Sequence, residues 1–363
     1  MSNEVALELK EVTKKYKKTN VISKMDLQIK NGEFLVLLGP SGCGKSTTLR
    51  MIAGLEKPSS GQILIDGQDA EKISSMERNL AMVFQDYALY PNMTVYQNLE
   101  YALKVHKVKK EERQQRLAKI LETLNLTEYQ DRLPGELSGG GQKQRVALGR
   151  GMAKQSKIFL LDEPLSNIDV QLREKARDEI QTLHEENQQT IVYVTHDQLE
   201  AMALGDRIAI INDGKIQMID TPDNIYNHPA NLFVAQFVGT PQINILEVDV
   251  QTTQLVYAEY PVLTNSARLA KLSVPSGQLY LGIRPEHVVV KCKQESASEL
   301  PAQVEAVIDY GRYQQLTLKL EEKQVLKAII TNNNFKIGDI VYASLAEDKI
   351  LLFDHKGKNN LES

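Results

Sequence analysis

The chain has 363 residues, a formal net charge of −4 at pH 7, and two cysteines, Cys43 and Cys292. This length is sufficient for two domains, and the charge gives no general electrostatic attraction to nucleic acid or anionic lipid. The cysteines lie far apart in the sequence, so we expect no disulfide framework and a reducing compartment. The N-terminus lacks the pattern of a signal peptide, and no run reaches the roughly 20 apolar residues that span a bilayer. Any role at a membrane is therefore expected to depend on a partner.

A glycine-rich segment lies between an apolar run at 34–38 and a helical pattern at 46–53. Its residues are Gly39, Pro40, Ser41, Gly42, Cys43, Gly44, Lys45, Ser46 and Thr47, which fit the phosphate-loop pattern G-x-x-x-x-G-K-[ST]. The backbone N–H groups of such a turn and the positive end of the following helix suit a polyphosphate. Lys45 can then reach the β- and γ-phosphates of a nucleotide, and the Ser46 hydroxyl can bind Mg²⁺. A simple glycine turn would explain the glycines but not Lys45 and Ser46.

Apolar runs and helical patterns alternate through the first part of the chain. Polar and apolar residues alternate around turn signals at 5–36, which predicts short strands before the loop. Further strands are expected at 62–67, 81–85, 158–162, 191–196 and 207–211. Helices are expected from residue 94 onward and at 109–126, 145–153, 170–186 and 198–204. This alternation predicts an α/β fold with a mainly parallel sheet.

Two of the expected strands end in residues that a nucleotide site needs. Asp162 and Glu163 follow an apolar run, and His196 follows another. Asp162 can hold Mg²⁺, whereas Glu163 points elsewhere, because neighbours on a strand alternate faces, and can polarise an attacking water. His196 can donate a hydrogen bond to a γ-phosphate. Ligand sites gather at the carboxyl ends of parallel strands, so a joint site is favoured over a solvated acidic turn or a helix cap.

Tyr16 and Gln85 have weaker signals. Tyr16 stands just before a turn and is either a half-buried strand aromatic or a ring that stacks on a nucleotide base. Gln85 ends an expected strand, and it could complete a Mg²⁺ shell or sense the γ-phosphate. Glutamines often end strands, so this position alone does not decide its role.

A second glycine-rich loop precedes the helix expected at 145–153. It contains Ser138, Gly139 and Gly140, and a serine-glycine loop at a helix N-terminus is another anion site. One nucleotide does not need two such loops from one subunit. A second copy of the chain could supply this loop to the opposite face of the γ-phosphate. The nucleotide would then join a head-to-tail dimer, and hydrolysis would weaken the interface.

The pattern changes near residues 237–241. Beyond them, short β-like runs are expected at 246–250, 279–283, 288–290, 304–308, 316–320, 325–330, 340–344 and 350–353. We therefore predict a second, all-β domain with the form of a small barrel or sandwich, and a polar, frayed tail from residue 356. The expected domains are 1–239, with a helical subdomain at about 88–153, and 240–363.

With these motifs in order, residues 5–237 closely resemble the ATPase subunit of ABC transporters. In that family Tyr16 corresponds to the A-loop aromatic, 39–47 to Walker A, Gln85 to the Q-loop, 137–140 to the signature loop, 158–163 to Walker B, 166–169 with Asp169 to the D-loop, and His196 to the switch histidine. The resemblance implies an α/β P-loop ABC ATPase domain with a helical subdomain. It also implies that Ser138, Gly139, Gly140 and Asp169 contribute to the ATP site.

Three segments, 87–95, 227–239 and 281–287, resemble the carbohydrate-importer branch, which contains the maltose-type and multiple-sugar ATPases. This resemblance implies a C-terminal all-β, OB-like (TOBE) regulatory domain, ATP and Mg²⁺, and a second ATPase subunit. It further implies two membrane permeases that contact residues 86–98 at the cytoplasmic face of the membrane, and an external solute-binding protein. Import of another solute, such as polyamine or ferric iron, remains an alternative, as does a soluble ABC ATPase that is not part of a transporter.

The chain departs from the family at one point. The family pattern is Leu-Ser-Gly-Gly-Gln, whereas this chain has one extra glycine, Gly141, before Gln142. An inserted residue at a helix start would rotate the first turn by about 100°, unless glycine absorbs it as a local bulge. Which glycine N–H meets the γ-phosphate of the partner's nucleotide is left open. Ile168 replaces the usual leucine of the D-loop, which is a minor change.

Overall fold

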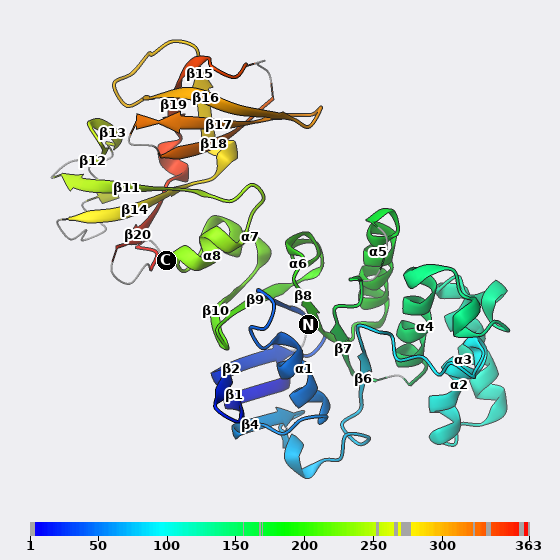
Figure 1. The fold of residues 1–363 in the computed structure, drawn as a ribbon. Helices are drawn as coiled ribbons and strands as arrows, with labels where there is room; N and C mark the ends of the chain where they lie inside the picture. The colour runs from blue at the N-terminus through cyan, green and yellow to red at the C-terminus, as the bar shows by residue number, and fades with distance from the viewer. Residues whose placement is uncertain are drawn as a thin grey trace. The chain divides into compact units, whose positions relative to one another are not determined.

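The computed structural model describes residues 4–154, 156–166, 168, 170–251, 254–264, 268–269, 277–321, 324–331, 335–355 and 359–361. The chain forms two compact units, Met1–Pro222 and Asp223–Ser363. Figure 1 labels the elements of both units, and each unit is described here by itself.

The centre of the first unit is a six-stranded sheet in the order β10-β9-β3-β8-β7-β6. Its strands are β3 (Phe34–Leu38), β6 (Leu80–Val83), β7 (Ile158–Asp162), β8 (Thr190–Thr195), β9 (Arg207–Asn212) and β10 (Lys215–Asp220). Strands β9, β3, β8, β7 and β6 are parallel, and only β10 pairs antiparallel within this sheet. Every residue of β3, β7 and β8 is buried, which explains their continuous apolar sequences. The predicted parallel α/β sheet is confirmed.

A second, antiparallel sheet has the order β2-β1-β4-β5. It consists of β1 (Val5–Tyr16), β2 (Thr19–Lys30), β4 (Ser60–Ile65) and β5 (Gln68–Asp69). Helix α1 (Lys45–Ala53) shares one hydrophobic core with both sheets through residues that include Leu49 and Ile52. This core fixes both ends of the glycine-rich loop, because the loop joins β3 to α1.

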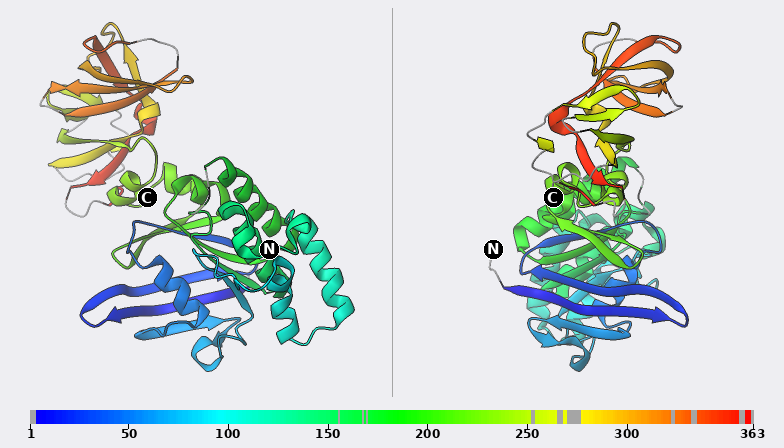
Figure 2. Two further views of the ribbon diagram at one scale, coloured as in Figure 1. Left: turned by 45° about the vertical axis from the view of Figure 1, so that its right-hand side comes forward. Right: turned by 90° about the vertical axis from the view of Figure 1, so that its left-hand side faces the viewer.

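Three helices form a separate group with its own core: α2 (Val95–Val105), α3 (Lys110–Thr123) and α4 (Gly139–Lys154). Figures 1 and 2 show this group beside the sheets of the first unit. Helix α5 (Val170–Asn187) follows β7, and α6 (Gln198–Leu204) follows β8. Short 3₁₀ turns lie at Ala70–Lys72, Thr127–Tyr129 and Pro134–Glu136. Among the described residues, no helix is both long enough and apolar enough to cross a membrane.

Two elements of this unit differ from the sequence-based expectation. Strand β6 ends at Val83 rather than at Gln85, because a turn follows in which Tyr87 and Ala88 have positive φ angles of 63° and 43°. Helix α4 begins at Gly139 rather than at Arg145. The side chain of Gln142 accepts a hydrogen bond from the Ser138 N–H at 2.8 Å, which provides a partner for a backbone donor at the helix start.

The second unit contains two five-stranded sheets, in the orders β13-β12-β11-β14-β20 and β15-β19-β16-β17-β18. The strands are β11 (Asn244–Gln251), β12 (Gln254–Tyr257), β13 (Tyr260–Leu263), β14 (Gln278–Ile283), β15 (Val288–Lys291), β16 (Leu300–Asp309), β17 (Gln314–Leu320), β18 (Val325–Ile330), β19 (Ile340–Leu345) and β20 (Leu351–Asp354). Short 3₁₀ turns lie at Pro285–His287 and Glu347–Lys349. All pairings are antiparallel, and one core spans both sheets. The all-β prediction is confirmed, although it did not include β12 and β13.

Two short helices, α7 (Pro222–Asn227) and α8 (Leu232–Phe237), precede these sheets. The guanidinium of Arg284, which is 3% exposed, donates to the carbonyl oxygens of Tyr226, Ala235 and Val238. Leu232 and Ala235 also share a small hydrophobic cluster with Phe353. These contacts explain why the packing divides the chain at Pro222, before the expected boundary at residue 239.

Asn98 on α2 is 1% exposed and holds the segment before this helix. Its Oδ1 accepts from Tyr90 N at 2.9 Å, and its Nδ2 donates to the carbonyls of Tyr90, Met93 and Thr94 at 3.1, 2.9 and 3.0 Å. We predict that Asn98→Ala lowers the free energy of unfolding by about 1–3 kcal/mol, because these part-buried backbone groups lose their partner. Urea unfolding followed by circular dichroism measures this. Gln97→Ala, which removes only an exposed capping contact, should cost less, and an equal loss in both variants would contradict the prediction.

Candidate active site

The glycine-rich loop joins the end of β3 to the start of α1 in a conformation that only glycine adopts readily. Gly42 and Gly44 have φ angles of 80° and 109°. A Cβ atom on Gly39 would lie 2.2 Å from the carbonyl oxygen of Ile211, so backbone packs directly against this residue. The glycines therefore allow the loop to curl tightly ahead of the helix, where backbone N–H groups have no partner inside α1.

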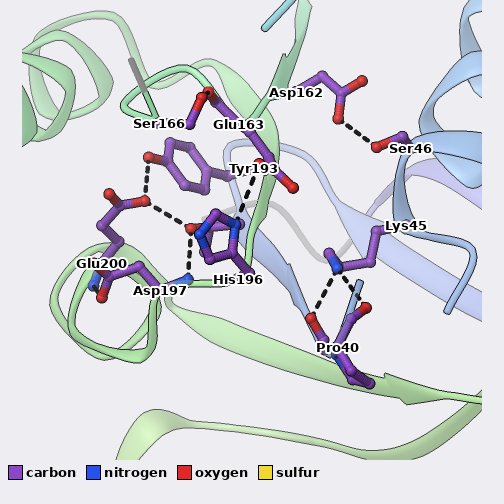
Figure 3. A network of polar contacts seen from close by, with 12 residues as sticks. Pro40, Lys45, Ser46, Asp162, Glu163, Ser166, Tyr193, His196, Asp197 and Glu200 are labelled. Carbon is purple, nitrogen blue, oxygen red and sulfur yellow. Dashed lines mark hydrogen bonds and ion pairs between the residues drawn. The ribbon is translucent and has the colours of Figure 1, made fainter. Parts of the chain in front are cut away.

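Lys45, the first residue of α1, points back into this loop. Its side chain is 5% exposed, and its Nζ donates to the carbonyl oxygens of Gly39 at 2.8 Å and Pro40 at 2.9 Å (Figure 3). The ammonium group and the positive end of α1 thus lie in the same small region. This concentration of positive charge and donors is what a polyphosphate requires.

Ser46 and Asp162 bring two oxygen ligands together from different elements. Asp162 is the last residue of β7 and is 5% exposed, and its Oδ1 accepts a hydrogen bond from Ser46 Oγ at 2.7 Å. Burial raises the pKa of the Asp162 carboxyl, and the Ser46 hydrogen bond opposes this effect. A hydroxyl and a carboxylate are hard oxygen ligands of the kind that Mg²⁺ takes when phosphates supply further oxygens. The chemistry of this pair therefore fits a magnesium ion.

Glu163 directly follows Asp162 but points to a different group. Its Oε2 lies 3.2 Å from Nδ1 of His196, whereas Asp162 points to Ser46 (Figure 3). The φ angle of Glu163 is 46°, a conformation that costs a non-glycine residue about 1–3 kcal/mol. Hydrogen bonds hold it there, because its N–H donates to the Val194 carbonyl at 3.0 Å and its carbonyl accepts from Ser166 Oγ at 2.9 Å.

The strand register explains why these groups meet. Leu38, which precedes the loop, pairs with Thr195, which precedes His196. Asp162 pairs with Val194 on the other side of β8. The structure therefore brings Lys45, Ser46, Asp162, Glu163 and His196 to the carboxyl ends of three adjacent strands, as the sequence predicted from their positions.

Other predicted site residues lie around this group. Tyr16 is 43% exposed at the end of β1; its hydroxyl donates to Glu56, and Lys14 Nζ lies 4.8 Å from its ring centroid. Gln85 is exposed in the turn after β6. Cys43 is buried within the loop, which raises the pKa of its thiol. Asp169, the predicted D-loop residue, lies outside the described residues.

The loop with the extra glycine belongs to the separate helical group. Ser138 and Gly139 are exposed, Gly139 has a φ angle of 83°, and α4 runs without interruption from Gly139 to Lys154. Gly141 is therefore part of the first helical turn and does not form a bulge. The exposed start of α4 leaves the N–H groups of Gly139 and Gly140 at the end of a long helix, where an anion from outside the subunit could be bound.

The sequence interpretation did not single out Arg173, Thr195 or Glu200, which line a small cavity together with Glu163, Ser166, His196 and Asp197. A signal was available for Glu200, because Asp197 and Glu200 have the spacing of a capping box. It would have suggested a helix cap, however, whereas the Glu200 side chain turns inward to Tyr193 and Thr195. Only the fold reveals that contact.

Comparison with known proteins identifies the two parts of the chain. The ABC transporter family matches residues 22–166, and the TOBE domain matches residues 281–353. The trehalose/maltose import ATP-binding protein MalK of Thermococcus litoralis is 48% identical over 288 residues, covering 77% of each chain. The sn-glycerol-3-phosphate import ATP-binding protein UgpC of Bordetella avium is 43% identical over 324 residues, covering 88% of each chain.

Solved structures agree with this assignment. The dimeric ATP-binding cassette MJ0796, in a post-hydrolysis state with ADP and Pi, is 34% identical with a TM-score of 0.54, and the match covers 60% of this chain and 98% of that chain. ADP and Pi, the products of ATP hydrolysis that this cassette holds, agree with the phosphate loop and the carboxylates at the strand ends. The resemblance drawn from the motifs is thus confirmed: the chain belongs to the ABC transporter ATPases of the carbohydrate-importer family, with a C-terminal TOBE domain.

Proposed function

We propose that this ATPase powers the import of sugars or oligosaccharides through a membrane permease. The observation that carries its chemistry is the pairing of Glu163 with His196, at 3.2 Å, beside the pairing of Ser46 with Asp162, at 2.7 Å. The sugar class is supported by the relative named for trehalose/maltose import, whereas another relative is named for import of sn-glycerol-3-phosphate, which is not a sugar. Import of another solute, such as polyamine or ferric iron, is the alternative, because in this family the permease and the external binding protein select the solute.

In this proposal the glycine-rich loop binds the phosphates of ATP. Lys45 and the N–H groups at the start of α1 interact with the β- and γ-phosphates, and the exposed ring of Tyr16 stacks on the base. Ser46, Asp162 and Gln85 would hold Mg²⁺, which would supply positive charge against the negative charge that develops on the phosphates. The roles of Ser41, Gly42 and Thr47 are to shape the loop and to provide further N–H and hydroxyl donors.

Glu163 is positioned to act as the general base. Its carboxylate accepts a proton from the water that attacks the γ-phosphate, and the rigid turn at Glu163 holds it in place. His196 contacts this carboxylate through Nδ1, and its ring can also donate to the γ-phosphate. The two residues together orient the water and the phosphate, so most of the catalytic effect comes from positioning.

A second subunit completes the site in this proposal. The start of α4, with Ser138, Gly139 and Gly140, closes on the γ-phosphate held by the partner's phosphate loop. Asp169, which lies outside the described residues, is assigned to the same ATP site by the family resemblance alone. The dimeric state of the related cassette MJ0796 supports this arrangement. Hydrolysis would remove the shared γ-phosphate and so allow the dimer to open.

The permease contact is proposed at residues 86–98, which would attach the ATPase to the cytoplasmic face of the membrane. A cavity of about 190 Å³ lies beside this segment, lined by residues that include Phe84, Tyr87 and Arg150. Arg150 Nη1 donates to the Ala88 carbonyl at 2.6 Å, so the turn is held against α4. Identifying the permease that co-purifies with the chain from membranes tests the proposal: a sugar permease supports it, and a polyamine or iron permease, or none, contradicts it.

We predict that Glu163→Gln lowers kcat for ATP hydrolysis by roughly 10²–10⁴-fold, because the amide cannot accept the proton. The variant should still bind ATP and form dimers, as measured by equilibrium binding and gel filtration. Glu112→Gln, an exposed glutamate on α3, is the control and should have normal turnover. Near-normal hydrolysis by Glu163→Gln would refute the assigned role.

A second prediction concerns the phosphate loop. Lys45→Ala should lower kcat/KM for ATP by roughly 10²-fold or more, because a buried cationic donor to the phosphates is lost. Lys72→Ala removes an exposed lysine and serves as its matched control. Steady-state ATPase kinetics of both variants measure the effect, and unchanged kinetics in Lys45→Ala would reject the placement of phosphates at this loop.

A third prediction concerns the extra glycine. Deletion of Gly141 should keep or raise ATPase activity, because Gln142 would then follow Gly140 directly, as in the family pattern. Gly141→Ala keeps the chain length and separates the effect of length from that of flexibility. Complete loss of activity in a folded deletion variant would show that the signature loop of this protein depends on the inserted residue.

A further inference from the structure

The residue before His196, Thr195, is held by one buried carboxylate, that of Glu200. Glu200, which is 4% exposed, accepts at Oε2 from the Tyr193 hydroxyl at 2.9 Å and from Thr195 Oγ1 at 2.7 Å (Figure 3). Thr195 Oγ1 in turn accepts from the Asp197 N–H at 3.0 Å. Thr195 and Asp197, which flank His196, are therefore joined by a hydrogen bond, and Glu200 connects Thr195 to α6.

Arg173 on α5 connects the same turn to the loop that follows Glu163. Its Nη1 lies 3.5 Å from Asp197 Oδ2, and its Nε lies 4.0 Å from Glu200 Oε1. Its Nη2 donates to the carbonyl of Ile168 at 3.3 Å. One guanidinium thus donates hydrogen bonds to Asp197 and to the Ile168 carbonyl, and its Nε lies near the Glu200 carboxylate without a hydrogen bond to it.

The Glu200 carboxyl is buried among groups that act on its pKa in opposite directions. Burial raises the pKa of Glu200, and Asp197 acts in the same direction, whereas Arg173 and the two hydroxyl donors oppose it. Asp197 uses its other oxygen, Oδ1, to cap α6 by accepting from Leu199 N at 2.8 Å. Loss of either Glu200 or Arg173 would leave part-buried polar groups without a partner and allow the turn at His196 to shift.

We propose that Glu200 and Arg173 are positioning residues for His196. They would hold its imidazole at the Glu163 carboxylate and link this position to the loop around Ile168. The inference rests on the proposed role of His196 in hydrolysis. Neither Glu200 nor Arg173 needs to contact ATP, so their loss should change the chemical step and leave ATP binding nearly intact.

The test compares Glu200→Gln and Arg173→Gln in the wild-type chain and in a His196→Ala background. In the wild-type chain, each should lower kcat by roughly 10- to 100-fold with an unchanged KM for ATP, because misplacement of a catalytic group slows the chemical step. In the His196→Ala background, neither should slow hydrolysis further, since both act through His196. Arg173→Lys keeps the charge and should recover part of kcat.

A second measurement does not depend on residual activity. In histidine-labelled full-length protein, NMR assigns the His196 ring signal by its loss in His196→Ala. This signal should shift in Glu200→Gln and in Arg173→Gln. Arg173 is only partly buried, so its variants carry the test even where Glu200→Gln does not fold.

An ion pair at the other end of the same sheet, between a buried glutamate and a partly exposed arginine, is the matched control. Arg207 Nε donates to Glu33 Oε1 at 2.7 Å, and Glu33 is 4% exposed, but this pair lies at the amino ends of β3 and β9. Glu33→Gln should reduce stability without moving the His196 signal, and its effect on kcat should be the same in both backgrounds. The positioning role would be overturned if Glu200→Gln lowered kcat further in the His196→Ala background. It would also be overturned if the His196 signal did not move in Glu200→Gln and Arg173→Gln. Full turnover in His196→Ala alone would instead refute the proposed role of His196.

Discussion

The register between β8 and its two neighbours is the constraint on which the site depends. Parallel pairing of Leu38 with Thr195 and of Asp162 with Val194 leaves the phosphate loop, the two carboxylates and the histidine at one edge of the sheet. These residues are far apart in the sequence, and only the burial of three continuous apolar strands brings them together. A shift of β8 by one residue against its neighbours would turn the side chains of β8 to the opposite faces of the sheet and displace His196 from Glu163.

The same edge separates two carboxylates that are neighbours in the chain. Asp162 remains on the strand and faces Ser46, whereas Glu163 adopts a left-handed backbone conformation and faces His196. In the proposed function, Asp162 holds the metal ion and Glu163 activates the water, so two adjacent carboxylates that face different groups have different tasks. The cost in backbone strain is met by hydrogen bonds to Val194 and Ser166, which makes this turn rigid.

The sequence was informative where local pattern and chemistry agree. Apolar runs that end in Gly39, Asp162 or His196 predicted both the parallel sheet and the residues that meet at its edge. It was less informative where tertiary contacts decide. Helix α4 begins with three glycines, where Gln142 provides a partner for Ser138, and Glu200 turns away from a capping position toward Tyr193. The strands β12 and β13 are short and give little periodic signal.

Through Arg284, the folding of the second unit depends on residues that precede its first strand. Its guanidinium is surrounded by carbonyl oxygens of residues 226–238, and Phe353 packs against Leu232. A chain that began at residue 240 would leave this cation buried without acceptors and would expose an apolar face of the β sheet. The shortest stretch of chain that satisfies Arg284 and covers Phe353 therefore includes α7 and α8. An exchange of the second unit between related ATPases would therefore preserve folding best if it were made near Pro222 and not at residue 237, where the resemblance to the ATPase subunit ends.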